Sequence, residues 1–268
     1  MRKLGGMISD ELLISKDQVE LSASICKVDL ISDLVGEFPE LQGIMGGYFA
    51  MEQGFDKEIA LALSEHYLPT GLDSKTPKKP FSIALALTDK IDTLVGFFGV
   101  NQKPTSSKDP YALRRSALGI IKLLIDNNKE FKIKDLISYS SSLHRDQGFE
   151  ISNDLSQKEL AEFLMDRLRY YMKEKKIRND IIEASISSYG IDHMNKIYKK
   201  ASTLNELIKK AVGEDIIASY KRASNILESE LKNKDLELSN TTDPGIFKND
   251  FEKNLFKKIN ELRKYFTN

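Results

Sequence analysis

Apolar residues recur at helical spacing along nearly the whole chain of 268 residues, whereas few stretches alternate apolar and polar residues. Alternation with a period of two is typical of a half-buried strand, and a spacing of three or four residues is typical of an amphipathic helix. We therefore predict an all-α fold. Stretches with proline and glycine divide the expected helices, at Gly36–Pro39, Pro69–Pro80, Gln102–Pro110, Gly148–Asn153 and Asn233–Gly245.

Charge is balanced over the chain but unevenly distributed along it. Forty basic and forty acidic residues exclude a uniformly cationic protein and leave room for a local patch. Residues 1–60 hold five basic and eleven acidic residues, and residues 102–134 hold eight basic and three acidic ones. The basic segment is a candidate polyanion-binding face, and a solvated helix surface is the alternative. Because no apolar run approaches the length of a membrane span, we expect a cytoplasmic protein without a membrane partner.

The basic segment contains the clearest local structure, a helix for which Asp109 is the predicted cap and Pro110 the first residue. Arg115 and Lys122 are predicted on its polar face, with Arg114 at the boundary. A helix start of this kind suits a phosphate, although Asp109 would repel one. Ion pairs between the two arginines and the acidic first segment are an open alternative. The predicted buried face consists of Leu113, Ala117, Ile120, Ile121 and Leu124.

The residues that could carry catalysis are few. A metal-dependent phosphohydrolase would use Asp29, Asp89 and Asp92, but no histidine stands near Asp89 or Asp92 in the sequence. The single cysteine, Cys26, lies in an apolar context that favours a buried thiol. Gly43, Gly46 and Gly47 superficially resemble a nucleotide loop, but no strand precedes them, which favours a turn or close helix packing. We predict no catalytic residue and no metal site, with the hydrolase as the alternative.

Several segments together resemble the β subunit of bacterial heterotetrameric glycyl-tRNA synthetase. The matching motifs keep the order and approximate spacing of the family. They are Lys27-Val28-Asp29-Leu30, Val35 to Gly46 (VGEFPELQGIMG), Glu65-His66-Tyr67-Leu68-Pro69, Ala84-Leu85-Ala86, Asp89 to Phe98 (DKIDTLVGFF), Lys103-Pro104-Thr105, Ser107-Lys108-Asp109-Pro110, Ala112-Leu113-Arg114-Arg115 and Lys221 to Leu227 (KRASNIL).

The resemblance implies three helical regions. Residues 1–130 would form an N-terminally incomplete domain similar to HD phosphohydrolases, residues 131–200 a helical linker, and residues 201–268 part of an anticodon-binding bundle. Chains of this family are much longer than this one. Two departures from the family pattern are Gly47 and Thr70, which stand where arginine is common, and they weaken an RNA-binding role for those two loops.

The resemblance also implies a function. The family enzyme is a class II α2β2 ligase that joins glycine to its tRNA using ATP and magnesium, with the ATP and glycine site in the α subunit. This chain would be a tRNA-binding portion without catalytic residues or a cofactor of its own, inactive alone. Its partners would be tRNA(Gly), the α subunit and the remainder of the β subunit. The candidate tRNA-binding residues are Lys108, Arg114, Arg115, Lys221 and Arg222. We expect the motif residues Phe38, Pro39, Leu41, Phe97 and Phe98 to lie in the core.

Overall fold

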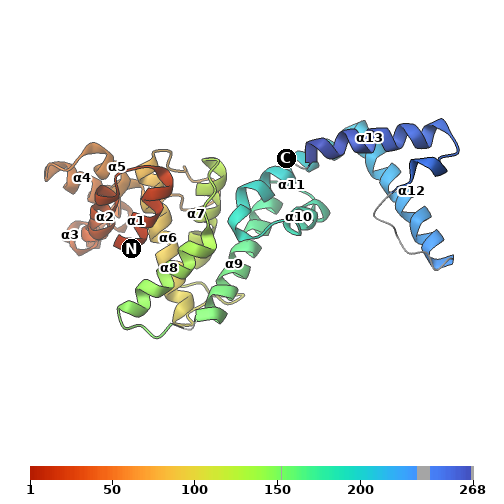
Figure 1. Cartoon of the computed structure of the whole chain (residues 1–268). Helices are drawn as coiled ribbons and strands as arrows, with labels where there is room; N and C mark the ends of the chain where they lie inside the picture. The colour runs from red at the N-terminus through yellow and green to blue at the C-terminus, as the bar shows by residue number, and fades with distance from the viewer. Residues whose placement is uncertain (152, 234–241, 267–268) are drawn as a thin grey trace. The chain divides into compact units, whose positions relative to one another are not determined.

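The computed structural model describes residues 1–151, 153–233 and 242–266. It confirms the predicted all-α class, because the described residues form helices and contain no β-strand (Figure 1). The chain divides into two compact units, Met1–Lys209 and Lys210–Asn268, and each is described by itself.

The first unit contains eleven α-helices and three short 3-10 helices among the described residues. In chain order they are α1 (Arg2–Leu12), α2 (Lys16–Ile25), η1 (Val28–Ile31), α3 (Asp33–Glu37), η2 (Pro39–Leu41), α4 (Ile44–Glu52), α5 (Lys57–Glu65), α6 (Pro80–Gly99), α7 (Leu113–Asp126), α8 (Ile133–Asp146), α9 (Asn153–Glu174), α10 (Asn179–Ile186), η3 (Ile191–His193) and α11 (Met194–Ile208). The two longest connections of this unit are residues 66–79, after α5, and 100–112, after α6. They overlap the predicted breaks Pro69–Pro80 and Gln102–Pro110.

Helix α6 is the centre of the first unit. Every residue from Phe81 to Ile91 is buried, and the helix contacts α1, α2, α5, α7, α8 and α9 (Figure 1). A helix that is buried on all sides must be largely apolar, as the sequence of α6 is. Pro80 occupies its first position, where the missing N–H of proline costs nothing. This helix therefore fixes the positions of the surrounding helices.

Two of the three glycines in the Gly43–Gly47 segment have the packing role that the sequence suggested. Gly43 has a φ of 82°, and a Cβ there would lie 2.8 Å from the ring of Tyr67. A Cβ on Gly47 would lie 1.8 Å from the Oγ of Ser64, so α4 and α5 approach one another closely at this point. An arginine at position 47, as is common in the resembled family, would need a wider separation of these two helices.

The second unit contains α12 (Ala211–Asn233), η4 (Pro244–Ile246) and α13 (Asp250–Phe266). Both helices expose apolar side chains, among them Tyr220 on α12 and Phe251 on α13. Among the described residues, no helix has both the length and the apolar character that crossing a membrane requires.

The α6–α7 contact depends on a glycine that makes room for a buried lysine. Lys90 on α6 is only 3% exposed, and its Nζ donates hydrogen bonds to the carbonyl oxygens of His66 and Tyr67 at 3.0 and 3.1 Å. A Cβ on Gly119 of α7 would lie 2.4 Å from Lys90 Cε and 3.3 Å from the carbonyl oxygen of Pro69. Because Lys90 is held at its end, its stem cannot move aside freely.

We predict that Gly119→Ala lowers the free energy of unfolding by about 1–3 kcal/mol, through overpacking against Lys90. Alanine is normally the better helix residue by roughly 1 kcal/mol, so the sign of the effect tests the contact. Gly36→Ala is the matched control, because nothing lies within 4 Å of a Cβ at that helical position. Thermal unfolding followed by circular dichroism measures both variants. Equal stability of the two would contradict this account of the α6–α7 packing.

Candidate functional site

Asp109 lies outside α7 and caps the free backbone N–H groups at the start of the helix. Its carboxylate oxygens accept hydrogen bonds from the backbone N–H groups of Leu113 and Arg114 at 2.8 and 2.9 Å. The prediction that Pro110 is the first helical residue was wrong, because the helix begins at Leu113 after a left-handed turn at Ala112, where φ is 53°. Since the carboxylate already occupies these two N–H groups, a phosphate would not bind to them.

Arg114 is held in place at the same junction. One of its guanidinium nitrogens donates a hydrogen bond to the carbonyl oxygen of Thr105, and another lies 3.8 Å from Asp109 Oδ2. The alternative that Arg114 pairs with the acidic first segment was therefore wrong. Arg114 instead braces the loop before α7, with its side chain still partly exposed.

Lys108 and Arg115 differ from Arg114 because their side chains make no hydrogen bond or ion pair with the described residues. Both are exposed, one in the loop and the other in the first turn of α7. Two other cations of the basic segment are neutralised. Lys103 pairs with Glu159 of α9, and Lys122 pairs with Asp126 at 3.4 Å.

The position of Lys122 corrects a prediction. Its helix face is buried rather than solvated, and Nζ donates a hydrogen bond to the carbonyl oxygen of Leu72 at 2.7 Å. The loop that follows α5 covers this face of α7, which the local sequence pattern could not indicate. The predicted apolar face is confirmed, because Leu113, Ala117, Ile120, Ile121 and Leu124 are all buried.

The structure thus brings three of the five predicted RNA-binding residues to one junction, formed by the loop before α7 and its first turn. Arg114 and Arg115 line a shallow depression of about 510 Å³, together with residues 70–73 and Asp109. We name Lys108, Arg114 and Arg115 the cationic junction. Lys221 and Arg222 are exposed on α12, in the second unit.

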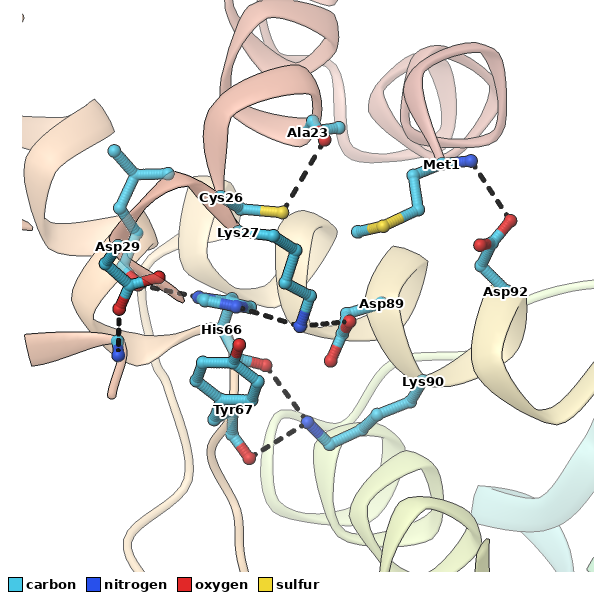
Figure 2. A network of polar contacts seen from close by, with 12 residues as sticks. Met1, Ala23, Cys26, Lys27, Asp29, His66, Tyr67, Asp89, Lys90 and Asp92 are labelled. Carbon is cyan, nitrogen blue, oxygen red and sulfur yellow. Dashed lines mark hydrogen bonds and ion pairs between the residues drawn. The ribbon is translucent and has the colours of Figure 1, made fainter. Parts of the chain in front are cut away.

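Arg115 of this junction also lines a polar cleft, whose lining includes Lys27. Lys27 follows Cys26, the C-cap of α2, and Figure 2 shows its polar contacts. Lys27 Nζ lies 2.7 Å from Asp89 Oδ1 and 3.2 Å from His66 Nε2. It also lies 3.9 Å from the centre of the Tyr67 ring, in a cation–π contact. Segments far apart in the sequence therefore meet at one ammonium group.

The hydrogen bonds of His66 define its tautomer. Nδ1 lies 2.6 Å from the carbonyl oxygen of Leu63, so it carries the proton, and Nε2 accepts a hydrogen bond from Lys27. Burial, and secondarily the charge of Lys27, lowers the pKa of His66 to about 4. The imidazole is consequently neutral at pH 7.

The two lysines of the cleft have pKa values shifted in opposite directions. Burial lowers the pKa of Lys90 to about 8, which leaves it mostly protonated at pH 7. Burial also lowers the pKa of Lys27, but the charge and hydrogen bond of Asp89 outweigh it, and the net shift is upward. Lys27 therefore stays charged between His66 and Asp89.

The three aspartates proposed for a hydrolase have separate partners. Asp29 Oδ2 accepts a hydrogen bond from the backbone N–H of Gly43 at 2.5 Å, and Asp89 pairs with Lys27. Asp92 lies 3.0 Å from the amino group of Met1 and 3.4 Å from His144 Nε2. Within the described ranges, no group of three or more His, Cys, Asp or Glu residues could hold a metal ion. These contacts give the hydrolase alternative no support.

Sequence reasoning missed Lys27, His66, Tyr67 and Lys90 as a connected group. Each of these residues lies in a motif quoted for the family resemblance. That shared feature is the sequence signal that could have linked them. Cys26 is buried as predicted, and burial raises its pKa to about 11.

The expectation of a core position was wrong for Phe38, Pro39 and Leu41, because η2 (Pro39–Leu41) has no buried residue. The Phe38 side chain is 46% exposed, and Pro39 lines the cleft. The short α3 that precedes them buries only Val35, so the chain leaves the core at this point.

Comparisons with known proteins match this chain to a single family. A family model described as "Glycyl-tRNA synthetase beta subunit" matches residues 1–187. The glycine–tRNA ligase beta subunit of Cereibacter sphaeroides (strain ATCC 17029) is 40% identical over 243 residues, covering 90% of this chain and 35% of the relative. That of Ruegeria sp. (strain TM1040) is 39% identical, covering 91% and 34%. That of Rickettsia canadensis (strain McKiel) is 37% identical, covering 92% and 35%. The chain spans about a third of the length of these curated relatives.

The lowered pKa of His66 predicts a specific loss of stability in acid. Between pH 6.5 and about 4 the unfolded chain binds a proton at this residue that the folded chain does not. The free energy of unfolding therefore falls as pH decreases through this window, by up to about 3 kcal/mol for this one group. His66→Asn keeps an N–H donor near Leu63 and cannot titrate, so its stability should fall less steeply. Parallel pH profiles of the two proteins in urea unfolding would contradict the assignment.

Proposed function

The chain belongs to the glycyl-tRNA synthetase beta-subunit family, and on that premise we propose that it is a tRNA-binding, non-catalytic portion of a glycine–tRNA ligase. The complete ligase would attach glycine to tRNA(Gly) at the expense of ATP, as a class II enzyme of α2β2 composition. The ATP, magnesium and glycine sites would belong to the α subunit. This chain would contribute tRNA recognition, and it would have no ligase activity alone.

The proposal depends mainly on the exposed cations of the cationic junction. Lys108 and Arg115 are exposed and unpaired among the described residues, and Asp109 and Thr105 hold the Arg114 side chain in place. Unpaired lysine and arginine side chains bind RNA phosphates by direct charge interaction and by release of counterions. Because Arg114 is already held in place, binding through it would cost less conformational entropy.

The cleft supports a non-catalytic role for the HD-like region. The ammonium of Lys27 forms an ion pair with Asp89 and a hydrogen bond with His66. The ammonium of Lys90 donates hydrogen bonds to two backbone carbonyl oxygens. A general acid or base must be able to reach a substrate proton, and these groups instead hold one another. We therefore assign this network to positioning the surrounding loops.

We retain the division into an HD-like region at 1–130, a linker at 131–200 and part of an anticodon-binding bundle at 201–268 as a proposal. Within it, Lys221 and Arg222 on α12 would form a second RNA contact. The α subunit and the remainder of the β subunit would be the protein partners.

We predict that Lys108→Ala combined with Arg115→Ala weakens tRNA(Gly) binding about 10-fold at low salt. The slope of log affinity against log salt should decrease by about 2, because each cation that is removed leaves one phosphate without its neutralising partner. Neither side chain has a partner among the described residues, so the melting temperature should be unchanged. Filter binding over a series of salt concentrations measures the affinity and the slope, and circular dichroism measures the melting temperature.

The matched control is Lys16→Ala combined with Lys57→Ala. Both are exposed lysines of the acidic first segment, so the total charge changes by the same amount. An equal effect of the two double variants would mean that only net charge matters, and it would remove the cationic junction from the RNA interface.

A further inference from the structure

The polar cleft beside the cationic junction has the size of a small-ligand site. Its volume is about 660 Å³, and its lining includes Gln42, Thr70, Thr93, Tyr111, Arg115 and Ser116. Small-molecule sites usually have volumes of roughly 300–1,000 Å³. Four residues of the network around Lys27 also line it: Lys27, Tyr67, Asp89 and Lys90.

Tyr111 gives this cleft a stacking surface. Its ring packs on Phe97, with centroids 4.2 Å apart and planes 26° apart, and the residue remains 46% exposed. Phe97 thus packs against the ring, while nearly half of the surface of Tyr111 stays accessible. Aromatic rings held in this way bind unpaired bases by stacking, with little dependence on sequence. Tyr67 is less suited to this role, because Lys27 lies over its ring.

Arg115 is the available cation in the cleft. Of the described cationic groups that line it, Met1, Lys27 and Lys90 each have an anionic or carbonyl partner. The Arg115 side chain makes no hydrogen bond or ion pair with the described residues, and it also lines the depression that contains Arg114. Glu40 lines the cleft as an exposed carboxylate. It repels a phosphate but accepts hydrogen bonds from ribose hydroxyls or base amino groups.

We infer that this cleft receives one unpaired nucleotide of the bound RNA, with its base stacked on Tyr111 and its phosphate held by Arg115. The inference rests on the proposed function, because the same Arg115 joins the cleft to the cationic junction. A strand that crosses the junction reaches the cleft at Arg115, which lines both the depression and the cleft. A paired base does not expose its face to an aromatic ring, so the site selects single-stranded RNA over duplex.

The absence of tryptophan from the chain allows a direct test. Tyr111→Trp keeps an aromatic ring on Phe97 and introduces at the cleft a single tryptophan, which can be excited at wavelengths where the tyrosines do not absorb. Adding a single-stranded RNA hexamer should quench its fluorescence to saturation, and a blunt-ended RNA duplex without unpaired nucleotides should not. Tyr48→Trp is the control, because Tyr48 is exposed on α4 and does not line this cleft. Equal quenching at the two positions would overturn the inference.

Affinity measurements give a second test. Tyr111→Leu keeps an apolar contact with Phe97 and removes the ring, and it should weaken hexamer binding about 10-fold in fluorescence anisotropy. Tyr111→Phe should bind as the wild type does. An unchanged affinity of a folded Tyr111→Leu variant would overturn the inference.

Lys108 separates this inference from the proposed function, because it belongs to the cationic junction but does not line the cleft. If Lys108→Ala weakens tRNA(Gly) binding and Tyr111→Leu leaves hexamer binding unchanged, the cleft inference fails and the proposed function stands. If the wild-type chain binds neither tRNA(Gly) nor the hexamer, both fail.

Discussion

The buried charges of α6 impose the arrangement on which the rest of the first unit depends. Asp89 and Lys90 are 8% and 3% exposed, in the middle of the helix that most of the unit packs against. A buried charge without a partner costs several kcal/mol, so each must be matched from another segment. Lys27 matches Asp89, and the carbonyl oxygens of His66 and Tyr67 match Lys90. The end of α2 and the loop after α5 are thereby fixed against α6.

This matching separates two classes of cation that look alike in the sequence. Lys27, Lys90 and Lys122 have partners in the interior, whereas Lys108 and Arg115 have none among the described residues. The first class supports the fold and the second is available to a polyanion. A scaffold whose central charges hold one another thus leaves Lys108 and Arg115 exposed at its edge, where the proposed contact with tRNA would form.

Sequence reasoning succeeded where the information was local. Helical spacing predicted the all-α class and the buried face of α7, and the apolar surroundings of Cys26 predicted its burial. It failed where distant segments decide the outcome. Lys122 is buried because the loop at Leu72 covers it, and Pro110 lies before α7 because Ala112 turns the chain there. The Lys27 network joins residues that only the folded chain brings together, although each lies in a family motif.

Hydrogen–deuterium exchange of the full chain, with and without saturating tRNA(Gly), tests the central claim most directly. The account predicts slower exchange in the loop at 101–112 and the first turn of α7 when tRNA is bound, with no change in α4 (Ile44–Glu52). Protection confined to α4 and the acidic first segment, or no protection at the loop before α7, would contradict it.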